Sequence, residues 1–224
     1  MRDHRQASPF AADLQFDPDV ALLDDCSGTF VWTASGTGGD DVHDHATSAA
    51  LTGTHGLRLL TRSTASAEND LLTLDRWLPW PTAQRLCLAT RSQCPSWAGV
   101  KYWYLYLNVY NGTRQYTAAL RISAATRILS YRDAAGGQTT ITGATVANAD
   151  AAWFNLGFCL DLDTLCYLNA RANGSSYDLA GTPCHNTAAT STRGLLLRLF
   201  LYASAAGPAA MFLDNLYAGS YDGP

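Results

Sequence analysis

Hydrophobic and polar residues alternate most strictly over residues 100–110, which read V-K-Y-W-Y-L-Y-L-N-V-Y. The odd positions from 103 to 109 are all apolar, whereas the even positions carry Tyr102, Tyr104, Tyr106, Asn108 and Tyr110. Successive side chains of a β-strand point to opposite faces, so this pattern predicts a strand with one buried apolar face. A helix, with its period of 3.6 residues, would mix the two sets. The other face, made of the five even residues, is called the tyrosine face below.

A hairpin is predicted directly after this strand. Asn111-Gly112 is a strong turn signal, and residues 114–122 return with a second strand-like pattern. A long strand with two distinct faces belongs in the middle of an antiparallel sheet. Its tyrosine face must then meet solvent, a ligand, a partner or the chain's own loops.

The rest of the chain reads as roughly a dozen short strands at regular spacing, and no amphipathic helix stands out. Strands are expected over residues 21–25, 29–34, 56–62, 70–78, 85–90, 127–132, 139–142, 152–161, 165–170, 176–179, 194–203 and 210–218. This spacing predicts an all-β protein, an antiparallel jelly-roll β-sandwich that forms a single domain over residues 20–224. Residues 35–45 are expected to form a loop.

Residues 1–19 are expected to form an extended N-terminal arm. They are polar, contain Pro9 and Pro18, and show no periodicity. Such a segment orders only by docking on something, and we expect it to contact another subunit.

Composition excludes several partners. Only 15% of residues are charged, the net charge is -4, and the arginines form no basic stripe, so we expect no nucleic acid partner. No apolar run is long enough to span a membrane, and the N-terminus lacks the apolar region of a signal peptide. We therefore expect synthesis in a host cytoplasm without a signal peptide, although the β-rich composition is that of a surface protein. A virion protein, released by lysis, reconciles these two features.

The cysteines leave two alternatives open. They are Cys26, Cys87, Cys94, Cys159, Cys166 and Cys184, with no C-x-x-C pair of the zinc-ribbon or thioredoxin type. If residues 161–164 form a four-residue turn, Cys159 lies opposite Cys166 within disulfide reach. Cytoplasmic synthesis favours the other alternative, buried free thiols that pack as small hydrophobic groups.

Four motifs in order along the chain carry a resemblance. They are Leu23-Asp24-Asp25 before Trp32; Gly53 with Gly56-Leu57-Arg58-Leu59; Trp153 followed by Asp161, Asp163, Thr164, Tyr167 and Asn169; and Phe212-Leu213-Asp214-Asn215-Leu216. Over residues 22–218 the chain thus resembles a jelly-roll carbohydrate-binding module or concanavalin A-like lectin domain. Structural proteins of phage virions also resemble this pattern of motifs. The resemblance implies fold far more than function, because such sandwiches host lectins, enzymes and viral proteins alike.

Two candidate metal sites follow. The resemblance implies a structural calcium between the first and last strands, which Asp24, Asp25 and Asp214 would hold; turn-forming or capping aspartates are the alternative. The run Asp40-Asp41-Val42-His43-Asp44-His45 is the densest set of ligand types. We interpret that run as a solvated polar loop, and we expect no other cofactor.

Catalytic motifs are missing. Glycosidases need two carboxylates in a cleft, but the chain has one glutamate, Glu68, and no aspartate pair in mid-strand. There is no Gly-x-Ser-x-Gly motif or credible Ser/His/Asp set. The chain is therefore not expected to be an enzyme, and polysaccharide degradation is the weakest alternative.

The expected function is that of a non-enzymatic structural or decorating protein of a phage virion, on the capsid or tail surface. It would assemble with other virion proteins or with copies of itself, through its arm and its sheet faces. The alternative is a carbohydrate-binding module or lectin-like adhesin that binds a surface polysaccharide. Tyrosine rings stack on sugars, and Asn108 offers a donor and an acceptor. Tyrosine is also enriched at interfaces, so the sequence favours an interface, or cover by the chain's own loops, above sugar binding on the tyrosine face.

Overall fold

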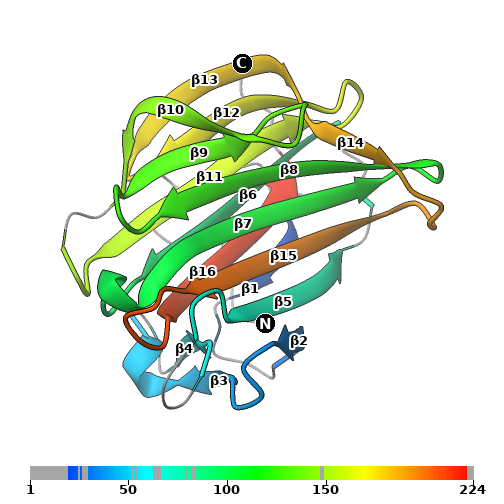
Figure 1. Cartoon of the computed structure of the whole chain (residues 1–224). Coiled ribbons are helices and arrows are strands. Elements are labelled where there is room, and N and C mark those ends of the chain that lie inside the picture. Colours follow the sequence, from blue (N-terminus) through cyan, green and yellow to red (C-terminus); the bar gives the residue numbers. More distant parts are fainter. Residues whose placement is uncertain are drawn as a thin grey trace.

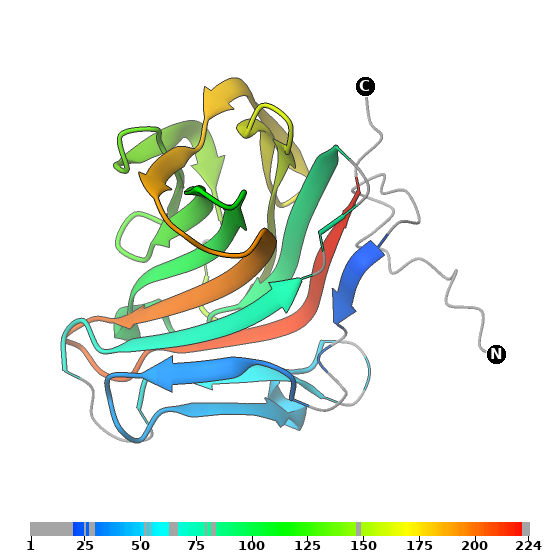
Figure 2. The same ribbon diagram turned by 90° about the vertical axis from the view of Figure 1, so that its right-hand side faces the viewer.

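The computed structural model describes residues 20–24 (backbone only), 26, 30–51, 53, 55–62, 67–78, 80–81, 84–146 and 149–220. The expected arm over residues 1–19 lies outside this part of the chain. The described residues form two antiparallel sheets of eight strands each, which confirms the predicted all-β sandwich. Figure 2 shows these layers, with the red strand β16 in one sheet and the orange strand β15 in the other.

Each sheet has a simple strand order. Sheet A runs β13 (Ser175–Pro183), β12 (Cys166–Ala172), β11 (Trp153–Asp161), β6 (Arg85–Gln93), β16 (Ala210–Ser220), β4 (Gly56–Leu60) and β3 (Val42–Ala46), with β1 (Val20–Asp24) also paired to β16. Sheet B runs β10 (Gln138–Thr145), β9 (Ile128–Arg132), β8 (Arg114–Ser123), β7 (Val100–Tyr110), β15 (Gly194–Ala203), β5 (Leu71–Leu78) and β2 (Thr33–Gly36), with β14 (His185–Ala188) also paired to β8.

Helical structure in the described residues is limited to two single turns of 3₁₀ helix, η1 (Thr47–Ala49) and η2 (Trp97–Gly99). Accordingly, the described part of the chain contains no helix of the length and apolarity that a membrane crossing requires.

Strand β7 lies in the middle of sheet B, as the alternation predicted, between β8 and β15 (Figure 1). Trp103, Leu105 and Leu107 are fully buried, whereas the neighbouring tyrosines are half-buried. The return strand begins after a loop in which Gly112 adopts a φ of 106°, a left-handed conformation that favours glycine. The predicted hairpin is therefore present.

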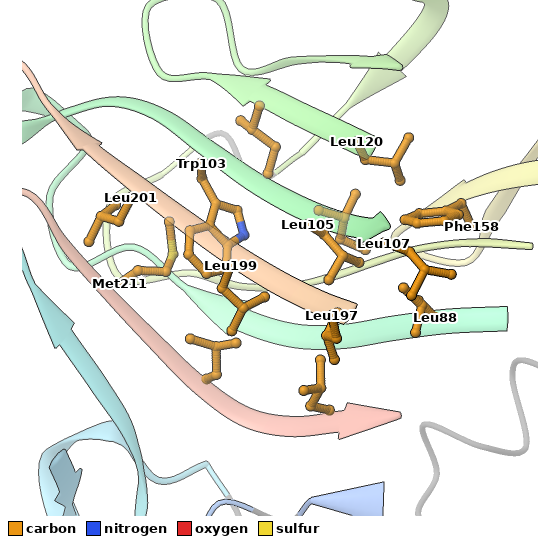
Figure 3. Close-up of a cluster of buried hydrophobic side chains, with 14 of the residues drawn as sticks. Leu88, Trp103, Leu105, Leu107, Leu120, Phe158, Leu197, Leu199, Leu201 and Met211 are labelled. Carbon is orange, nitrogen blue, oxygen red and sulfur yellow. The ribbon is translucent and has the colours of Figure 1, made fainter. Parts of the chain in front are cut away.

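The core fills the space between the sheets. Leucines of β15 (Leu197, Leu199 and Leu201) lie beside Trp103, Leu105 and Leu107 of β7 and face Leu88, Phe158 and Met211 of sheet A (Figure 3). Burying one such side chain stabilises the fold by about 1.5–3 kcal/mol. The inner faces of both sheets thus form one continuous apolar layer.

One buried side chain crosses this layer and forms hydrogen bonds with the opposite sheet. Tyr167 of β12 is fully buried, and its Oη accepts a hydrogen bond of 2.8 Å from the Ala119 backbone N–H of β8. The same hydroxyl donates to the Arg132 carbonyl of β9, 3.0 Å away. The phenol therefore lies between β8 and β9 and satisfies backbone groups of both strands.

Polar strands at the sheet edges depart from the sequence-based expectation. The second strand is β2 (Thr33–Gly36) rather than residues 29–34, and the expected loop over residues 35–45 contains most of strand β3. Strand β14 was not predicted at all. These segments lack apolar alternation because they bury little surface, so tertiary pairing rather than local pattern makes them strands.

The expectation that all six cysteines are free thiols was wrong for one pair. Cys87 of β6 forms a disulfide with Cys159 of β11, and these residues are direct cross-strand partners. The predicted opposition of Cys159 and Cys166 is also wrong: Asp161 pairs with Cys166, and Cys159 pairs with Asn169. The turn comprises residues 162–165 rather than 161–164, and Leu165 takes a φ of 53° there. The other four cysteines, all of them among the described residues, form no disulfide.

Removing the Tyr167 hydroxyl should destabilise the fold. In Tyr167→Phe the Ala119 N–H and the Arg132 carbonyl lose a buried partner, which costs about 1–3 kcal/mol. Urea unfolding measures the loss. Tyr177→Phe, which removes an exposed hydroxyl bonded to the Gly143 carbonyl, is the matched control and should change stability by less than about 0.5 kcal/mol. Equal effects of the two changes would contradict the bridging role.

Thiol counting tests the disulfide. Denatured protein that has not been reduced should show four reactive thiols, and reduction should expose six. The bond joins residues 72 positions apart, so its loss in Cys87→Ala should cost about 4 kcal/mol on the chain-entropy scale. Cys166→Ser, at a half-buried free thiol, should leave the melting temperature nearly unchanged. Six thiols before reduction would restore the sequence-based expectation.

Candidate functional site

The outer face of sheet B, turned towards the viewer in Figure 1, carries a hollow of about 210 Å³. Its walls come from four strands of the sheet. They are Tyr104, Tyr106 and Asn108 of β7, Arg198, Phe200 and Tyr202 of β15, Gln115 and Thr117 of β8, and Arg132 of β9. Strand pairing brings these residues together, because Phe200 pairs with Tyr104 and Thr117 pairs with Asn108.

Aromatic rings form one side of the hollow. The rings of Tyr106 and Phe200 lie edge to face with centroids 4.8 Å apart. Tyr104 contacts the rings of Tyr106 and Tyr202, with centroid distances of 5.4 and 5.7 Å. Such edge-to-face and tilted pairs suit the charge distribution of aromatic rings. The cluster is thus held in place by its own ring contacts, and its members remain half-buried rather than covered.

Arg198 is fixed by a carboxylate. Its Nε donates to Asp75 Oδ1 at 2.8 Å and its Nη2 donates to Asp75 Oδ2 at 2.7 Å, a two-point contact between neighbouring strands. The hydrogen bonds to Asp75 raise the pKa of Arg198, against the opposing effect of burial. The central guanidinium carbon of Arg198, Cζ, also lies 5.4 Å from the Phe200 ring centroid. Arg198 is therefore held rigidly, with its charge balanced.

Amide and hydroxyl groups form a short chain at another side of the hollow. Gln115 Nε2 donates to Thr117 Oγ1 at 3.1 Å, and Thr117 Oγ1 donates to Asn108 Oδ1 at 3.0 Å. Asn108 is 2% exposed, so its carbonyl is both buried and used by the protein. Thr117 is 5% exposed and its hydroxyl is used in both directions, so Gln115 is the best placed of these three side chains to meet a ligand.

Arg132 reaches the hollow from β9. Its Nη1 lies 3.4 Å from Tyr106 Oη, at the limit of a weak hydrogen bond. Its Nε is buried without an acceptor among the described residues. The backbone carbonyl of the same residue accepts the Tyr167 hydroxyl, so the inter-sheet bond holds the strand from which the guanidinium extends.

Only part of the tyrosine face belongs to the hollow. Tyr104, Tyr106 and Asn108 line the hollow, whereas Tyr102 and Tyr110 lie beyond it along the same strand. Tyr102 stacks under Arg121, with 4.9 Å from the guanidinium carbon to the ring centroid, and Tyr110 contacts Trp77 at 5.5 Å. The described residues that line the hollow all belong to strands.

Strand β15 contributes three residues to the hollow that were not predicted as site residues. Residues 194–203 were expected to form a strand, but their outward set was not recognised as part of a site. Arg198, Phe200 and Tyr202 alternate with Leu197, Leu199 and Leu201, which is the same two-faced pattern as in β7. Such alternation in a second strand was the signal available in the sequence. Arg132, Gln115 and Thr117 carried no comparable signal.

Only Asp214 of the three candidate calcium ligands has a described side chain. Asp25 lies outside the described residues, as does the side chain of Asp24. Asp214 is buried and accepts hydrogen bonds from the Leu51 N–H (3.2 Å) and Asn215 Nδ2 (2.8 Å). These contacts fit a structural aspartate that stabilises neighbouring backbone.

The acidic and histidine-rich run lies mostly on the edge strand β3, with the two faces that alternation requires. Its two histidines share a face with Phe30, with ring centroids 5.2 Å from His43 and 5.9 Å from His45. Asp44 instead pairs with Arg58 of β4. Over the described residues, no three His, Cys, Asp or Glu side chains gather as a metal site.

Alkaline titration should report the packing of the tyrosines. Burial is the main cause that raises the pKa of Tyr104 and Tyr202 above 10.0, and it raises the pKa of Tyr167 much further. Because the neutral phenol is favoured in the folded state, this contribution to stability is complete below pH 10 and is lost as pH rises through the folded pKa values.

Near-ultraviolet absorbance of the native protein should therefore show a late phase of tyrosine ionisation, followed by unfolding. Tyr104→Phe should reduce the amplitude of that phase. The denatured protein is the control, since all its tyrosines should ionise near the ordinary value of about 10. Native and denatured curves that coincide would contradict the packing described above.

Comparisons with known proteins place the fold. No family model and no curated protein matches the sequence. A conserved carbohydrate esterase from the Shiga toxin-encoding bacteriophage phi24B superposes with a TM-score of 0.58 at 14% identity, over 91% of this chain and 99% of that one. The carbohydrate recognition domain of Emp46p gives 0.51 at 11% identity, over 93% and 99% of the chains. The β-glucanase of Bacillus licheniformis gives 0.50 at 9% identity, over 92% and 100%.

At these identities the likeness shows the fold alone, and it shows it over almost the full length of every chain compared. The chain therefore has the concanavalin A-like jelly-roll β-sandwich fold, which both carbohydrate-binding proteins and glucanases adopt.

Proposed function

We propose that the protein binds a glycan in the hollow of sheet B and does not cleave it. The observation that carries this proposal is the lining of the hollow, where half-buried aromatic rings stand beside fixed polar side chains. Sugar rings have apolar faces and polar edges, so they need both kinds of contact. Pockets for small ligands combine apolar walls with a few placed polar groups in the same way.

The position of the rings supports sugar binding. Tyr104 packs against Tyr106 and Tyr202, and Phe200 packs against Tyr106. These contacts keep the rings of the cluster in place, so binding orders few new rotamers. A preorganised aromatic surface loses less conformational entropy when a ligand stacks on it. Gln115 and Arg132, at the other side, can direct hydrogen bonds to ring hydroxyl groups.

The chemistry of the lining supports binding without hydrolysis. Glycoside hydrolysis uses two carboxylates, yet none of the described residues that line the hollow is an aspartate or glutamate. The nearby carboxylate of Asp75 is engaged by Arg198 through both oxygens. A serine-type esterase needs a nucleophile beside a histidine, and the described lining includes no serine, cysteine or histidine.

The comparisons favour this function over the structural role expected from the sequence. Emp46p matches through a carbohydrate recognition domain, and the phi24B protein is described as a carbohydrate esterase. Assembly in a virion stays a prediction, because neither the fold nor the hollow tests it. The two roles are compatible if the chain is the adhesive part of such a particle.

A glycan array, followed by melting of a double variant, tests the proposal. The parent protein should bind one group of glycans, and Tyr104→Ala with Tyr106→Ala should abolish that binding. Each ring lost from a stack removes about 0.5–1.5 kcal/mol beyond its area burial, for the ligand and for the cluster alike. The melting temperature should therefore fall modestly, because both rings are only half-buried.

Trp77→Ala provides the matched control. Trp77 is 59% exposed on the same face and lies outside the hollow, so its loss removes an aromatic ring without touching the lining. Binding should persist in this variant. No binding by the parent, together with collapse of stability in the double variant, would overturn the proposal and favour an interface on the tyrosine face.

A further inference from the structure

The hollow contains one arginine whose charge the protein balances and one whose charge it does not. Arg198 is neutralised by the two-point contact with Asp75. Arg132 forms no ion pair with any described residue, and its one side-chain hydrogen bond, to Tyr106 Oη, is 3.4 Å long. The hollow therefore carries net positive charge, although the whole chain has a net charge of -4.

The aspartate that follows Arg132 in the chain and the one glutamate of the sequence both have partners other than Arg132. Asp133, the next residue, accepts hydrogen bonds from the Gly137 N–H at 2.9 Å and Thr139 Oγ1 at 2.9 Å, within the turn between β9 and β10. Glu68 is paired with Lys101 at the far end of β7. Neither carboxylate contacts Arg132.

A second arginine adds to the same field. Arg121 of β8 donates from Nε to Ser130 Oγ at 3.2 Å and lies over the Tyr102 ring, next to the tyrosines of the hollow. It has no ion pair among the described residues either. Two uncompensated guanidinium groups on one sheet face attract anions, and the low dielectric of a hollow strengthens that attraction.

The side chain of Arg132 lines the hollow and extends from a strand that is held in place. Its strand is held by the Tyr167 hydroxyl, and its Nε is buried without an acceptor. The guanidinium fork matches the planar geometry of a carboxylate better than that of a hydroxyl group.

We infer that the hollow selects glycans that carry carboxylate groups, such as uronic acid residues, and that Arg132 binds the carboxylate. This inference rests on the proposed function, since it concerns the ligand of the same hollow. The aromatic rings stack on the apolar face of the sugar, and the guanidinium of Arg132 binds the negatively charged carboxylate. Arg198 lines the hollow but does not bind the anion, because Asp75 balances its charge.

The test uses the full chain on an array with three sets of probes: uronic acid oligosaccharides of several linkages, their methyl esters, and sulfated neutral oligosaccharides. The esters keep the sugar and lose only the charge. Free acids should bind about tenfold to a hundredfold more tightly than their own esters. Their binding should also weaken as salt concentration rises.

Arg132→Gln should remove the preference and lower acid binding to the level of the esters, whereas Arg132→Lys, which keeps the charge without the fork, should restore part of it. Arg114→Gln is the matched control. Arg114 is exposed, bonded to Asn186 and outside the hollow, so its loss changes net charge equally but should leave the preference intact. Melting curves show whether each variant is folded, and the comparison of acid with ester on the parent protein needs no variant.

The outcomes separate the two proposals. Equal binding of acids and esters, or binding of sulfated chains in preference to carboxylated ones, would overturn the inference while leaving glycan binding in place. Retention of the acid preference in Arg132→Gln would also overturn it. Absence of binding to every probe, neutral glycans included, would refute the proposed function itself.

Discussion

The phenolic oxygen of Tyr167 forms a buried hydrogen-bonded link between the two sheets. It belongs to sheet A, yet it accepts from the Ala119 N–H and donates to the Arg132 carbonyl of sheet B. Dispersion contacts hold two sheets at a distance but specify their lateral position weakly, whereas a hydrogen bond has direction and reach. Through this bond the core of the sandwich determines where β9 lies, and β9 carries one wall of the hollow.

The second constraint is the matched alternation of β7 and β15. Leu105 pairs with Leu199 on the inner face, while Tyr104 pairs with Phe200 on the outer face. A shift of one residue would move Leu105 to solvent and Tyr104 into the core, so register is strongly specified. The same requirement that builds the core therefore builds the ring cluster of the hollow, with no separate folding element for the site.

These constraints explain what the sequence could and could not reveal. Strands such as β7 and β15 are predictable because each buries an apolar face, and that burial leaves a period-two pattern. Edge strands such as β14 bury little and leave none. The hollow was foreseen only through Tyr104, Tyr106 and Asn108, which lie on one strand. Arg132 joins them by strand pairing, which no single segment encodes.

The cysteine pair shows the same limit. Cys87 and Cys159 are partners because β6 and β11 are neighbours, and nothing in the sequence between these cysteines, which lie 72 positions apart, indicates the pairing. The short spacing between Cys159 and Cys166 suggested a pairing that the hairpin register does not allow. Local spacing predicts cross-strand neighbours only when the turn length is known, and a shift of the turn by one residue was enough to change the partner.

Strand β3 has a bearing on how the molecule behaves in a crowded solution. It ends the strand order of sheet A, so its outer backbone groups could template strand addition by a second molecule. Its sequence, V-H-D-H-A, places the Asp44–Arg58 ion pair on one face and two imidazole rings on the other. An incoming strand would have to desolvate these polar groups and gain little apolar contact in return. The polar side chains of β3 therefore disfavour edge-to-edge aggregation, and this effect requires no bound ion.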